Sequence, residues 1–487
     1  FVPLPERIVM RYNSIDELPT HDASRKEDRD LLSGEITFKI VAQNPILVAD
    51  GMQDDGPRKF VKNVNGMYEI PGSSLRGPMR NVVSVLSLTD WTEQMDDERF
   101  FYRSVGESSS TIGKHYKQVL NVSTKIVNNK RESVPQNVKA GYIAKMKDGN
   151  YCIYHAKTDG GRLGKTYYKV NNGNITIRKN SFANNVKRGF FVEEATFSIN
   201  ENGKVVKLFH DNASFRGHLL YSGYIRTGKT NKVSAYLINE IDKEKKPIHI
   251  RMEDIKAYKA DLKYRLSKFQ KNNRQRMKDF FELPEKPGLE HAKPCFYIEY
   301  DNVTYFGFTA FLRLLYPNST KNLLPDQIIN KGSGVDYASA LFGFTVNSHS
   351  KLKSNYASRL HFHSATIKGN VQPLKPVHVI LGSPRASANR FYINQDNKMD
   401  TNNYNTYLNK DATIRGMKQY WIKDAENVPV DEKRQSSMTQ LEVLPKQTTF
   451  EAKITFDQLH EDELGLLLWA LKGPKYHQLG MGKPYGY

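Results

Sequence analysis

The last residues of the chain are of the types that bind a phosphodiester backbone. The segment HQLGMGKPYGY, residues 477–487, contains Gly480, Gly482, Lys483 and Tyr485. Glycine lets a backbone come close to a bulky anion, lysine supplies positive charge, and a tyrosine ring can stack on a base. The segment therefore predicts contact with a nucleic-acid strand, with an ordinary flexible terminus as the alternative.

A second set of residues has the composition of an anion site. The segment PGSSLRGPMR spans residues 71–80, and its turn residues predict that a helix begins at Ser73 or Ser74. Arg76 and Arg80 then fall on the first turns of that helix. The free N–H groups of a helix start, serine hydroxyls and arginine side chains all bind phosphate. We expect this helix start to hold phosphate groups of the ligand.

The charge of the whole chain agrees with a polyanionic partner. Its 487 residues include 72 Lys and Arg against 52 Asp and Glu, a formal charge of +20 at pH 7. Aromatic residues make up 11%, and the 27 tyrosines outnumber the 24 phenylalanines. Basic charge mixed with tyrosine favours single-stranded RNA or DNA over a membrane surface, where an amphipathic basic helix or a lipid anchor is typical. The other explanation for the charge is solubility.

Length and cysteine content indicate the number of domains and the cellular compartment. A chain of this length is expected to form two or three domain-sized units. The only cysteines, Cys152 and Cys295, lie far apart without a CxxC motif, which argues against a disulfide framework and a cysteine-rich zinc site. No apolar run approaches the roughly 18 residues of a membrane span. We therefore expect a cytoplasmic protein with no membrane partner.

Strand and helix patterns are clearest near the two ends of the chain. EITFKIVAQNPILV at 35–48 alternates apolar and polar residues as a half-buried strand does, and residues 68–88 are typical of a strand end, a turn and a helix. Residues 449–472 repeat the order of strand and helix, and the glycine-rich segment follows directly. The middle is less regular, apart from a basic helix predicted at 254–281. These patterns predict an α+β protein.

These features occur in an order that resembles a known family. A strand is followed by IPGSSLRG, and near the other end DELGLLLWAL is followed by LGMGKPYGY. The order resembles the repeat-associated mysterious protein (RAMP) superfamily, the RNA-binding subunits of CRISPR effector complexes, and in particular the backbone subunits of type III complexes. Segments at 340–344, 358–365, 381–393 and 414–421 are also similar to that family, so the resemblance covers most of the chain outside the middle.

The resemblance implies a modified ferredoxin-like fold, in which helices cover one face of an RNA-recognition-type sheet with large insertions. It divides the chain into an N-terminal arm (1–34), a first RAMP segment with the PGSS turn (35–130), a central insertion or degenerate second module (131–290), and a C-terminal RAMP segment (291–487). It adds Gly77 to the RNA-binding residues of the turn. The hypothesis of a second module depends on Ser214 and Arg216, which match Ser74 and Arg76 in type and spacing. The alternative is that this match is a coincidence.

The resemblance also implies a catalytic residue. Some type III backbone subunits cut target RNA with one aspartate in the loop between the first strand and the PGSS turn. Here that loop holds Asp50, Asp54 and Asp55, and Asp55 lies sixteen residues before Pro71 in a similar Asp-Gly-Pro context. We expect Asp55, with Asp54 as the fallback, to bind Mg²⁺ or Mn²⁺ and so polarise a phosphate or activate a ribose 2′-hydroxyl. A plain turn is the alternative, because Asp-Gly is itself a turn signal.

Other catalytic patterns are weaker or absent from the sequence. His361 and His363 alternate on a predicted strand and could ligate a metal together, but no third ligand is evident. We therefore expect the two histidines to lie in a core or to face RNA. The sequence lacks a Walker loop, a nucleophile elbow and an HExxH motif.

Three functions remain open. The first is a guide-RNA-binding backbone subunit of a type III CRISPR ribonucleoprotein in antiviral defence, which contacts the other subunits and cuts complementary target RNA. The second is a non-catalytic guide-RNA scaffold or capping subunit of the same complex, and the third is an RNA-binding protein outside CRISPR. In the family pattern another strand follows the glycine-rich loop. We therefore expect a longer natural chain, or a strand from a neighbouring subunit, with the terminal loop against RNA.

Overall fold

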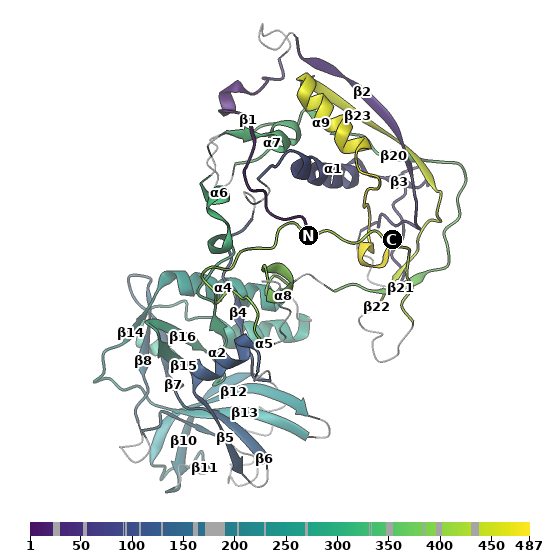
Figure 1. Cartoon of the computed structure of the whole chain (residues 1–487). Helices are drawn as coiled ribbons and strands as arrows, with labels where there is room; N and C mark the ends of the chain where they lie inside the picture. The colour runs from purple at the N-terminus through teal and green to yellow at the C-terminus, as the bar shows by residue number, and fades with distance from the viewer. Residues whose placement is uncertain are drawn as a thin grey trace. The chain divides into compact units, whose positions relative to one another are not determined.

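The chain folds into two compact units, whose course Figure 1 shows. The first unit comprises residues 1–96, 323–394 and 413–487, and the second unit comprises residues 97–322 and 395–412. The computed structural model describes residues 1–22, 30–51, 56–90, 92, 95–106, 109–127, 130–158, 164–170, 190–201, 204–227, 230–267, 271–330, 332, 334–346, 354–382, 385–395, 402–429 and 438–487.

A five-stranded antiparallel sheet organises the first unit. Its strands are β2 (Leu32–Val41), β23 (Thr449–Leu459), β19 (Leu360–Phe362), β20 (Ala365–Lys368) and β3 (Glu69–Ile70). β23 lies between β2 on one side and β19 with β20 on the other, and β3 pairs with β20. Ile36 and Phe38 of β2 pack on the core while Glu35 and Thr37 are exposed, which confirms the predicted half-buried strand.

Helices pack on one face of this sheet. α1 (Gly72–Leu86) contacts both α9 (Glu461–Lys472) and α7 (Tyr337–Phe342). Leu75, Met79 and Val83 of α1 share one buried core with Leu467 of α9 and the inward side chains of the sheet. Figure 1 shows α1 and α9 on the same side of β2 and β23. The predicted order of strand and helix at both ends of the chain is therefore confirmed.

Shorter elements complete the first unit. The N-terminal segment, predicted as an arm, forms β1 (Met10–Tyr12), which pairs with β18 (Val335–Asp336). Tyr12 and Leu18 are buried in a small cluster with Val335, so this part of the predicted arm belongs to a packed core. The remaining elements are η1 (Ile15–Glu17), α6 (Asp326–Ile329), β21 (Val377–Ile380), α8 (Asn389–Tyr392), β22 (Met438–Leu441), which pairs with β21, and η6 (Lys483–Tyr485).

The second unit is built on two further antiparallel sheets. One contains β11 (Val205–Leu208), β10 (Phe191–Ile199), β12 (Phe215–Thr227), β13 (Thr230–Asn239) and β9 (Tyr167–Lys169) in that order. The other contains β14 (Ile248–Ile250), β8 (Tyr151–His155), β7 (Lys139–Lys145), β15 (Lys293–Tyr300) and β16 (Val303–Gly307). Cys152 and Cys295 lie in this second sheet, both buried and unpaired.

Helices and two strand pairs accompany these sheets. The strand pairs are β4 (Phe101–Tyr102) with β17 (Leu314–Leu315), and β5 (Val122–Val127) with β6 (Lys130–Pro135). The helices are α2 (Thr111–Leu120), α4 (Met252–Ser267), α5 (Lys271–Phe281) and η3 (Leu289–His291), and η4 (Lys321–Leu323) follows at the change of unit along the chain. The basic helix predicted at 254–281 is thus two helices, α4 and α5.

The described strand ladders are antiparallel and helices occur in both units, which is compatible with an α+β protein. The unit boundaries differ from the predicted division at residues 130 and 290. β15 pairs with β7, so residues after 290 belong to the second unit, and that unit already begins at Asp97. Within the described ranges, no helix combines the length and the apolar composition that crossing a bilayer requires.

Candidate nucleic-acid interface

Helix α1 starts one residue earlier than its serines suggest. The helix begins at Gly72, with Pro71 before it, and no serine side chain caps it. The Ser74 N–H donates to the Pro71 carbonyl at 2.9 Å. A Cβ on Gly72 would come within 1.9 Å of the Phe362 carbonyl oxygen, so this glycine lets α1 approach β19. Ser73 is left exposed at the helix start, where its hydroxyl is available to a ligand.

Arg76 and Arg80 both point to the end of α7. The Arg76 guanidinium donates to the Phe342 carbonyl and lies over the Phe342 ring, 5.5 Å from its centre. The Arg80 guanidinium donates to the Gly343 carbonyl at 3.5 Å. Burial lowers the pKa of Arg80, the positive charge of Arg76 lowers it further, and the Asp336 carboxylate opposes both effects. The two guanidinium groups are therefore fixed side by side with N–H donors to spare.

Arg76 and Arg80 form no ion pair with a described carboxylate, as is also true of Arg385 and Arg415, although the Asp336 carboxylate acts on Arg80 through its charge. Ion pairs with Asp or Glu are formed by Arg11, Arg99, Arg251, Arg265, Arg313 and Arg359. No ion pair joins Arg76 or Arg80 to a carboxylate that the structure describes. Two half-buried positive charges that repel each other favour an anion between them or beside them.

The helix surface next to the arginines is open, as it also is at Gly465 of α9. Gly77 is exposed on α1, and a Cβ there would meet nothing within 4 Å. Pro78 follows inside the helix and has no N–H to donate. A glycine inside a helix costs roughly 0.5–1 kcal/mol relative to alanine, and here no packing contact explains it. The backbone of α1 is therefore accessible beside Arg76 and Arg80.

The glycines of the terminal loop have backbone conformations and close packing contacts that favour glycine. Gly480, Gly482 and Gly486 have φ values of 89°, 91° and 81°, which L-residues seldom adopt. A Cβ on Gly480 would lie 2.3 Å from the Leu47 carbonyl oxygen, and one on Gly486 would lie 2.5 Å from the Asp424 carbonyl oxygen. These glycines therefore allow the loop to pack on the protein itself. Their close approach to RNA is not needed to explain them.

Lys483 and Tyr485 are held in the same packed loop. The Tyr485 hydroxyl donates to the Ile380 carbonyl at 3.2 Å, and the Lys423 ammonium lies 6.0 Å from the centre of its ring. Burial lowers the pKa of the Lys483 ammonium. Tyr487 is only 9% exposed and belongs to the core that also contains Leu75. The loop is thus an ordered part of the first unit, and the alternative of a flexible terminus is wrong.

The two predicted phosphate sites lie on the same unit but are not joined directly. The start of α1 and the terminal loop share one buried core, in which Leu75 and Tyr487 take part. Among the described residues, no hydrogen bond links Arg76 or Arg80 to Lys483. A ligand that contacts both sites must therefore extend from one to the other over the surface of the first unit.

Ser214 and Arg216 do not reproduce the start of α1. Ser214 precedes β12 and Arg216 lies within it, opposite Thr196 of β10, so no helix begins there. Farther along the same strand Leu219, Leu220 and Tyr221 are all buried, so β12 is a central strand of its sheet. The segment with Ser214 and Arg216 is therefore similar to the PGSS segment in sequence only. It belongs to the second unit.

The predicted catalytic aspartates Asp54 and Asp55 lie outside the described residues. Asp50, in the same loop, is described, and its carboxylate accepts the Gly51 N–H at 2.8 Å. His361 and His363 lie with their rings 4.5 Å apart, and Thr455 is 3.3 Å from Nε2 of His363. Within the described ranges, no group of three or more His, Cys, Asp or Glu residues is placed to hold a metal.

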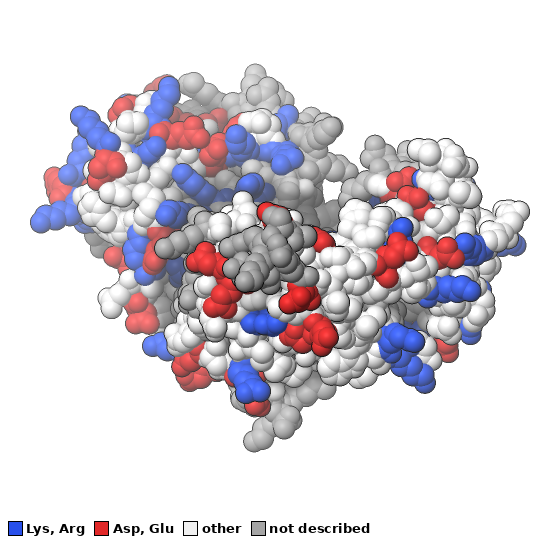
Figure 2. All heavy atoms as spheres, turned by 90° about the horizontal axis from the view of Figure 1, so that it is seen from above, with Lys and Arg blue, Asp and Glu red and all other residues white. Residues whose placement is uncertain are grey.

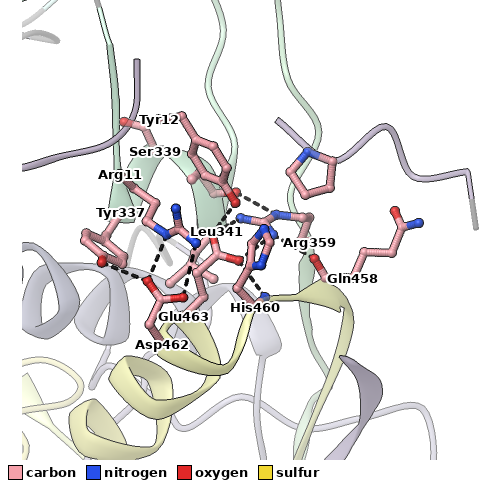
Figure 3. A network of polar contacts seen from close by, with 12 residues as sticks. Arg11, Tyr12, Tyr337, Ser339, Leu341, Arg359, Gln458, His460, Asp462 and Glu463 are labelled. Atoms are coloured by element: carbon pink, nitrogen blue, oxygen red, sulfur yellow. Dashed lines mark hydrogen bonds and ion pairs between the residues drawn. The ribbon is translucent and has the colours of Figure 1, made fainter. Parts of the chain in front are cut away.

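A buried polar network supports the interface, and the sequence patterns did not predict it. Figure 3 shows the Arg359 guanidinium facing the Glu463 carboxylate, with Nη1 and Oε2 2.7 Å apart and both side chains fully buried. The Tyr12 hydroxyl donates to the same carboxylate at 3.0 Å, and burial followed by the Glu463 charge raises the pKa of Tyr12. Arg359 Nε also donates to the Ala340 carbonyl at 3.1 Å. The network therefore fixes α7, to which Arg76 and Arg80 bind.

Charge alone does not locate the interface. Figure 2 shows Lys and Arg side chains scattered among Asp and Glu over one face, without a continuous basic field.

No protein-family model matches the sequence, and a search of curated proteins finds no match either. The strongest local evidence for a ligand is therefore the geometry of Arg76, Arg80 and Gly77.

Proposed function

We propose that this chain is a guide-RNA-binding backbone subunit of a cytoplasmic type III CRISPR ribonucleoprotein that acts in antiviral defence. The observation that carries the proposal is the pair formed by Arg76 and Arg80. Both are half-buried, both donate to carbonyls at the end of α7, and neither forms an ion pair with a described carboxylate. The pair lies at the start of the helix that follows the PGSS turn, where the resemblance to RAMP proteins expects RNA contacts.

The topology of the first unit supports a modified ferredoxin-like fold. Along the chain, β2, α1, β19 with β20, β23 and α9 give the order strand, helix, strand, strand, helix. In space β23 lies between β2 and the β19–β20 strand segment, and the helices lie on one face. A ferredoxin-like unit has this order and this central position of the third strand. Residues 97–322 are then the large insertion.

The chemistry of the interface suits recognition of a backbone rather than of bases. Guanidinium groups, the N–H groups of a helix start and an exposed serine hydroxyl all bind phosphate oxygens. Phosphate contacts carry no base information, so affinity should vary little between guide sequences. Lys483 adds a positive charge on the terminal loop, and Ser73 and Ser74 add donors at the start of α1.

Cleavage of target RNA is the catalytic part of the proposal. Asp55, or Asp54 in its place, would hold a divalent metal ion that stabilises charge on the phosphate being cut. Asp50 is less suited because its carboxylate already accepts the Gly51 N–H. Loss of cleavage by the assembled complex on Asp55→Ala, with RNA binding retained, separates this function from a non-catalytic scaffold or capping subunit.

The proposal is tested by RNA binding of an Arg76→Ala, Arg80→Ala double variant. We expect the affinity for a guide RNA to fall by about tenfold or more. The log–log slope of affinity against salt should decrease by about 1.4, because each phosphate contact to a single strand contributes roughly 0.7. Filter binding over a salt series measures both quantities.

Arg385→Ala is the matched control, because Arg385 is an exposed arginine of the same unit. It should change neither the affinity nor the slope. The double variant Arg76→Lys, Arg80→Lys should recover part of the affinity, since it restores charge without the forked geometry. Unchanged binding by the double alanine variant would show that the interface lies elsewhere, and no RNA binding by the unmodified protein would refute the function.

A further inference from the structure

An exposed tryptophan lies on an extended segment of the first unit. Trp421 is 89% exposed and its neighbour Ile422 is 60% exposed, within residues 413–425. Tryptophan is highly buried on average in folded proteins. Two adjacent, strongly exposed apolar side chains are typical of a surface that another molecule covers.

The exposure of Trp421 does not come from a loose loop. Met417 and Val2 exchange two backbone hydrogen bonds, each of 2.8 Å. The Tyr420 carbonyl accepts from Gln478 Nε2 at 2.8 Å, and the Lys423 carbonyl accepts from Asn44 Nδ2 at 2.7 Å. The backbone is therefore held on both sides of Trp421, and the indole ring is presented to solvent from a fixed base.

Positive charges and further rings surround the tryptophan along the chain. The Lys418 ammonium lies 4.7 Å from the centre of the Tyr420 ring and 4.9 Å from that of Phe391. No described carboxylate forms an ion pair with Lys418. Lys423, by contrast, is paired with Glu426 at 2.7 Å. Lys418 is thus a cation beside aromatic rings and without an ion pair to a described carboxylate, the combination with which proteins bind single-stranded nucleic acid.

The segment continues into the terminal loop. The Glu426 N–H donates to the Tyr485 carbonyl at 2.9 Å, and Gly486 packs against the Asp424 carbonyl. Trp421 is therefore close in the chain to the residues on which the loop of Lys483 rests. The segment that carries Trp421 and the loop that carries Lys483 are therefore joined by direct contacts.

We propose that Trp421 is a stacking platform for an unpaired nucleobase of the bound RNA, with Lys418 neutralising an adjacent phosphate. The inference rests on the proposed function and adds to it the requirement for a single-stranded segment. A protein partner with an apolar pocket is the other candidate occupant. The ammonium of Lys418, which has no ion pair with a described carboxylate, and the chain's charge of +20 favour the polyanion.

Intrinsic fluorescence and affinity test the platform. The chain contains three tryptophans, and binding of a short oligouridylate should quench part of their emission. An abasic ribose-phosphate oligomer of the same length offers the phosphates without the bases and should cause no such quenching. Trp421→Phe should remove most of the quenching by oligouridylate, because the stacked fluorophore is then absent.

Affinity distinguishes stacking from charge. Trp421→Ala should weaken binding of the oligouridylate about tenfold, in the range that removal of one stacking ring causes, and leave binding of the abasic oligomer unchanged. Trp421→Tyr should restore most of the affinity. Trp469→Ala is the matched control, since Trp469 of α9 is also exposed, at 57%, and should bind both oligomers as the unmodified protein does.

Each outcome decides one proposal. Equal binding of oligouridylate by Trp421→Ala and by the unmodified protein overturns the platform, while the role of Arg76 and Arg80 stands. Loss of another subunit from the complex in Trp421→Ala, with RNA affinity unchanged, also overturns it and assigns the surface to a protein partner. Absence of binding to either oligomer by the unmodified protein instead refutes the proposed function.

Discussion

Two glycines on the same helix have opposite roles. Gly72 touches the backbone of β19, and a Cβ there would overlap the Phe362 carbonyl oxygen at 1.9 Å. Gly77 has open space around it and faces solvent. The first glycine is therefore required by packing, whereas no packing contact requires the second, which leaves room for the proposed RNA ligand.

Alanine at these two positions should change stability in opposite directions. We expect Gly77→Ala to stabilise the protein by about 0.5–1 kcal/mol, because alanine has less backbone freedom to lose in a helix. Gly72→Ala should destabilise it by roughly 1–3 kcal/mol or more, because α1 must move away from β19. Urea unfolding of the two variants measures both changes.

RNA affinity is a second measurement on the variant Gly77→Ala, because Gly77 lies in the proposed interface. Gly77→Ala should bind guide RNA more weakly than the unmodified protein although it is more stable, since its methyl group occupies the open surface. Equal or tighter RNA binding by Gly77→Ala would place the RNA away from this part of α1.

The roles of single residues were predictable only where they depend on near neighbours. The arginines of PGSSLRGPMR were predicted on the first turns of a helix, and the structure places them there. The terminal glycines were predicted to approach RNA, but Gly480 approaches Leu47, more than 400 residues earlier in the chain. A glycine such as Gly480 can indicate that another part of the chain comes close to its backbone. The sequence around it does not show which residue that is.

At the level of elements, the end of α7 is the support for the interface. Its last carbonyls accept hydrogen bonds from three arginines: Ala340 and Leu341 from Arg359, Phe342 from Arg76, and Gly343 from Arg80. The backbone N–H of Arg359 makes the contact with Leu341, and its side chain continues to Glu463 at the start of α9. The buried ion pair therefore holds α7 between β19 and α9.

Removing one partner of this ion pair should be costly. We expect Glu463→Ala to destabilise the first unit by about 3–5 kcal/mol, because it leaves the Arg359 charge buried without a counter-charge. Arg359→Met combined with Glu463→Leu should cost less, since no charge then remains buried. Asp462→Ala is the control, because the exposed Asp462–Arg11 pair should contribute less than about 1 kcal/mol. Urea unfolding gives the three values, and equal losses for Glu463→Ala and Asp462→Ala would contradict the assigned importance of the buried pair.

Turns whose conformation depends on the residues within them were easier to predict than pairings between distant strands. The sequence YDNVTY predicts a hairpin turn at Asp301 and Asn302, and both residues have the positive φ values, 51° and 58°, that such a turn requires. The pairing of β19 with β23 joins residues about 90 positions apart. The alternation of each strand indicates which side chains are buried, but it does not name the partner strand.

At the scale of the whole molecule, the two units were harder to delimit than their elements. The second unit interrupts the first twice along the chain, at residues 97–322 and 395–412. Its short return segment is held by contacts such as that of Asn318 Nδ2 with the Tyr407 carbonyl at 3.0 Å. The return segment is polar and rich in asparagine, but that composition does not indicate to which unit the segment belongs. The first unit carries the proposed RNA interface, and the second unit has a distinct chemistry of its own.

Partly buried histidines with hydrogen bonds to tyrosines are a feature of the second unit. Nδ1 of His115 lies 2.6 Å from the Tyr102 hydroxyl, and Nδ1 of His155 lies 2.6 Å from the Tyr297 hydroxyl. Burial lowers the pKa of His115. Burial, and then the charge of Lys245, lowers that of His155. Both rings are therefore neutral at pH 7, with Nδ1 free to accept the tyrosine proton.

These shifts should make the second unit less stable in acid. In the unfolded chain histidine binds its proton near pH 6.5, whereas in the folded unit the same residues bind it only at lower pH. The unfolded state therefore takes up more protons as pH falls below about 6.5. The contribution of the two histidines is complete above that pH and is lost as pH falls through their folded pKa values. We expect the thermal midpoint of the second unit to fall between pH 7.5 and pH 5.5, as followed by scanning calorimetry.

The double variant His115→Asn, His155→Asn isolates this effect. An asparagine oxygen can accept the tyrosine proton but does not titrate, so the variant should show a smaller fall in the thermal midpoint over the same pH interval. Carboxylates with ordinary pKa values remain largely ionised at pH 5.5 and contribute little to the difference. An equal fall in the variant and in the unmodified protein would show that other groups cause the acid sensitivity. A rise in the midpoint of the unmodified protein on acidification would contradict the direction of both pKa shifts.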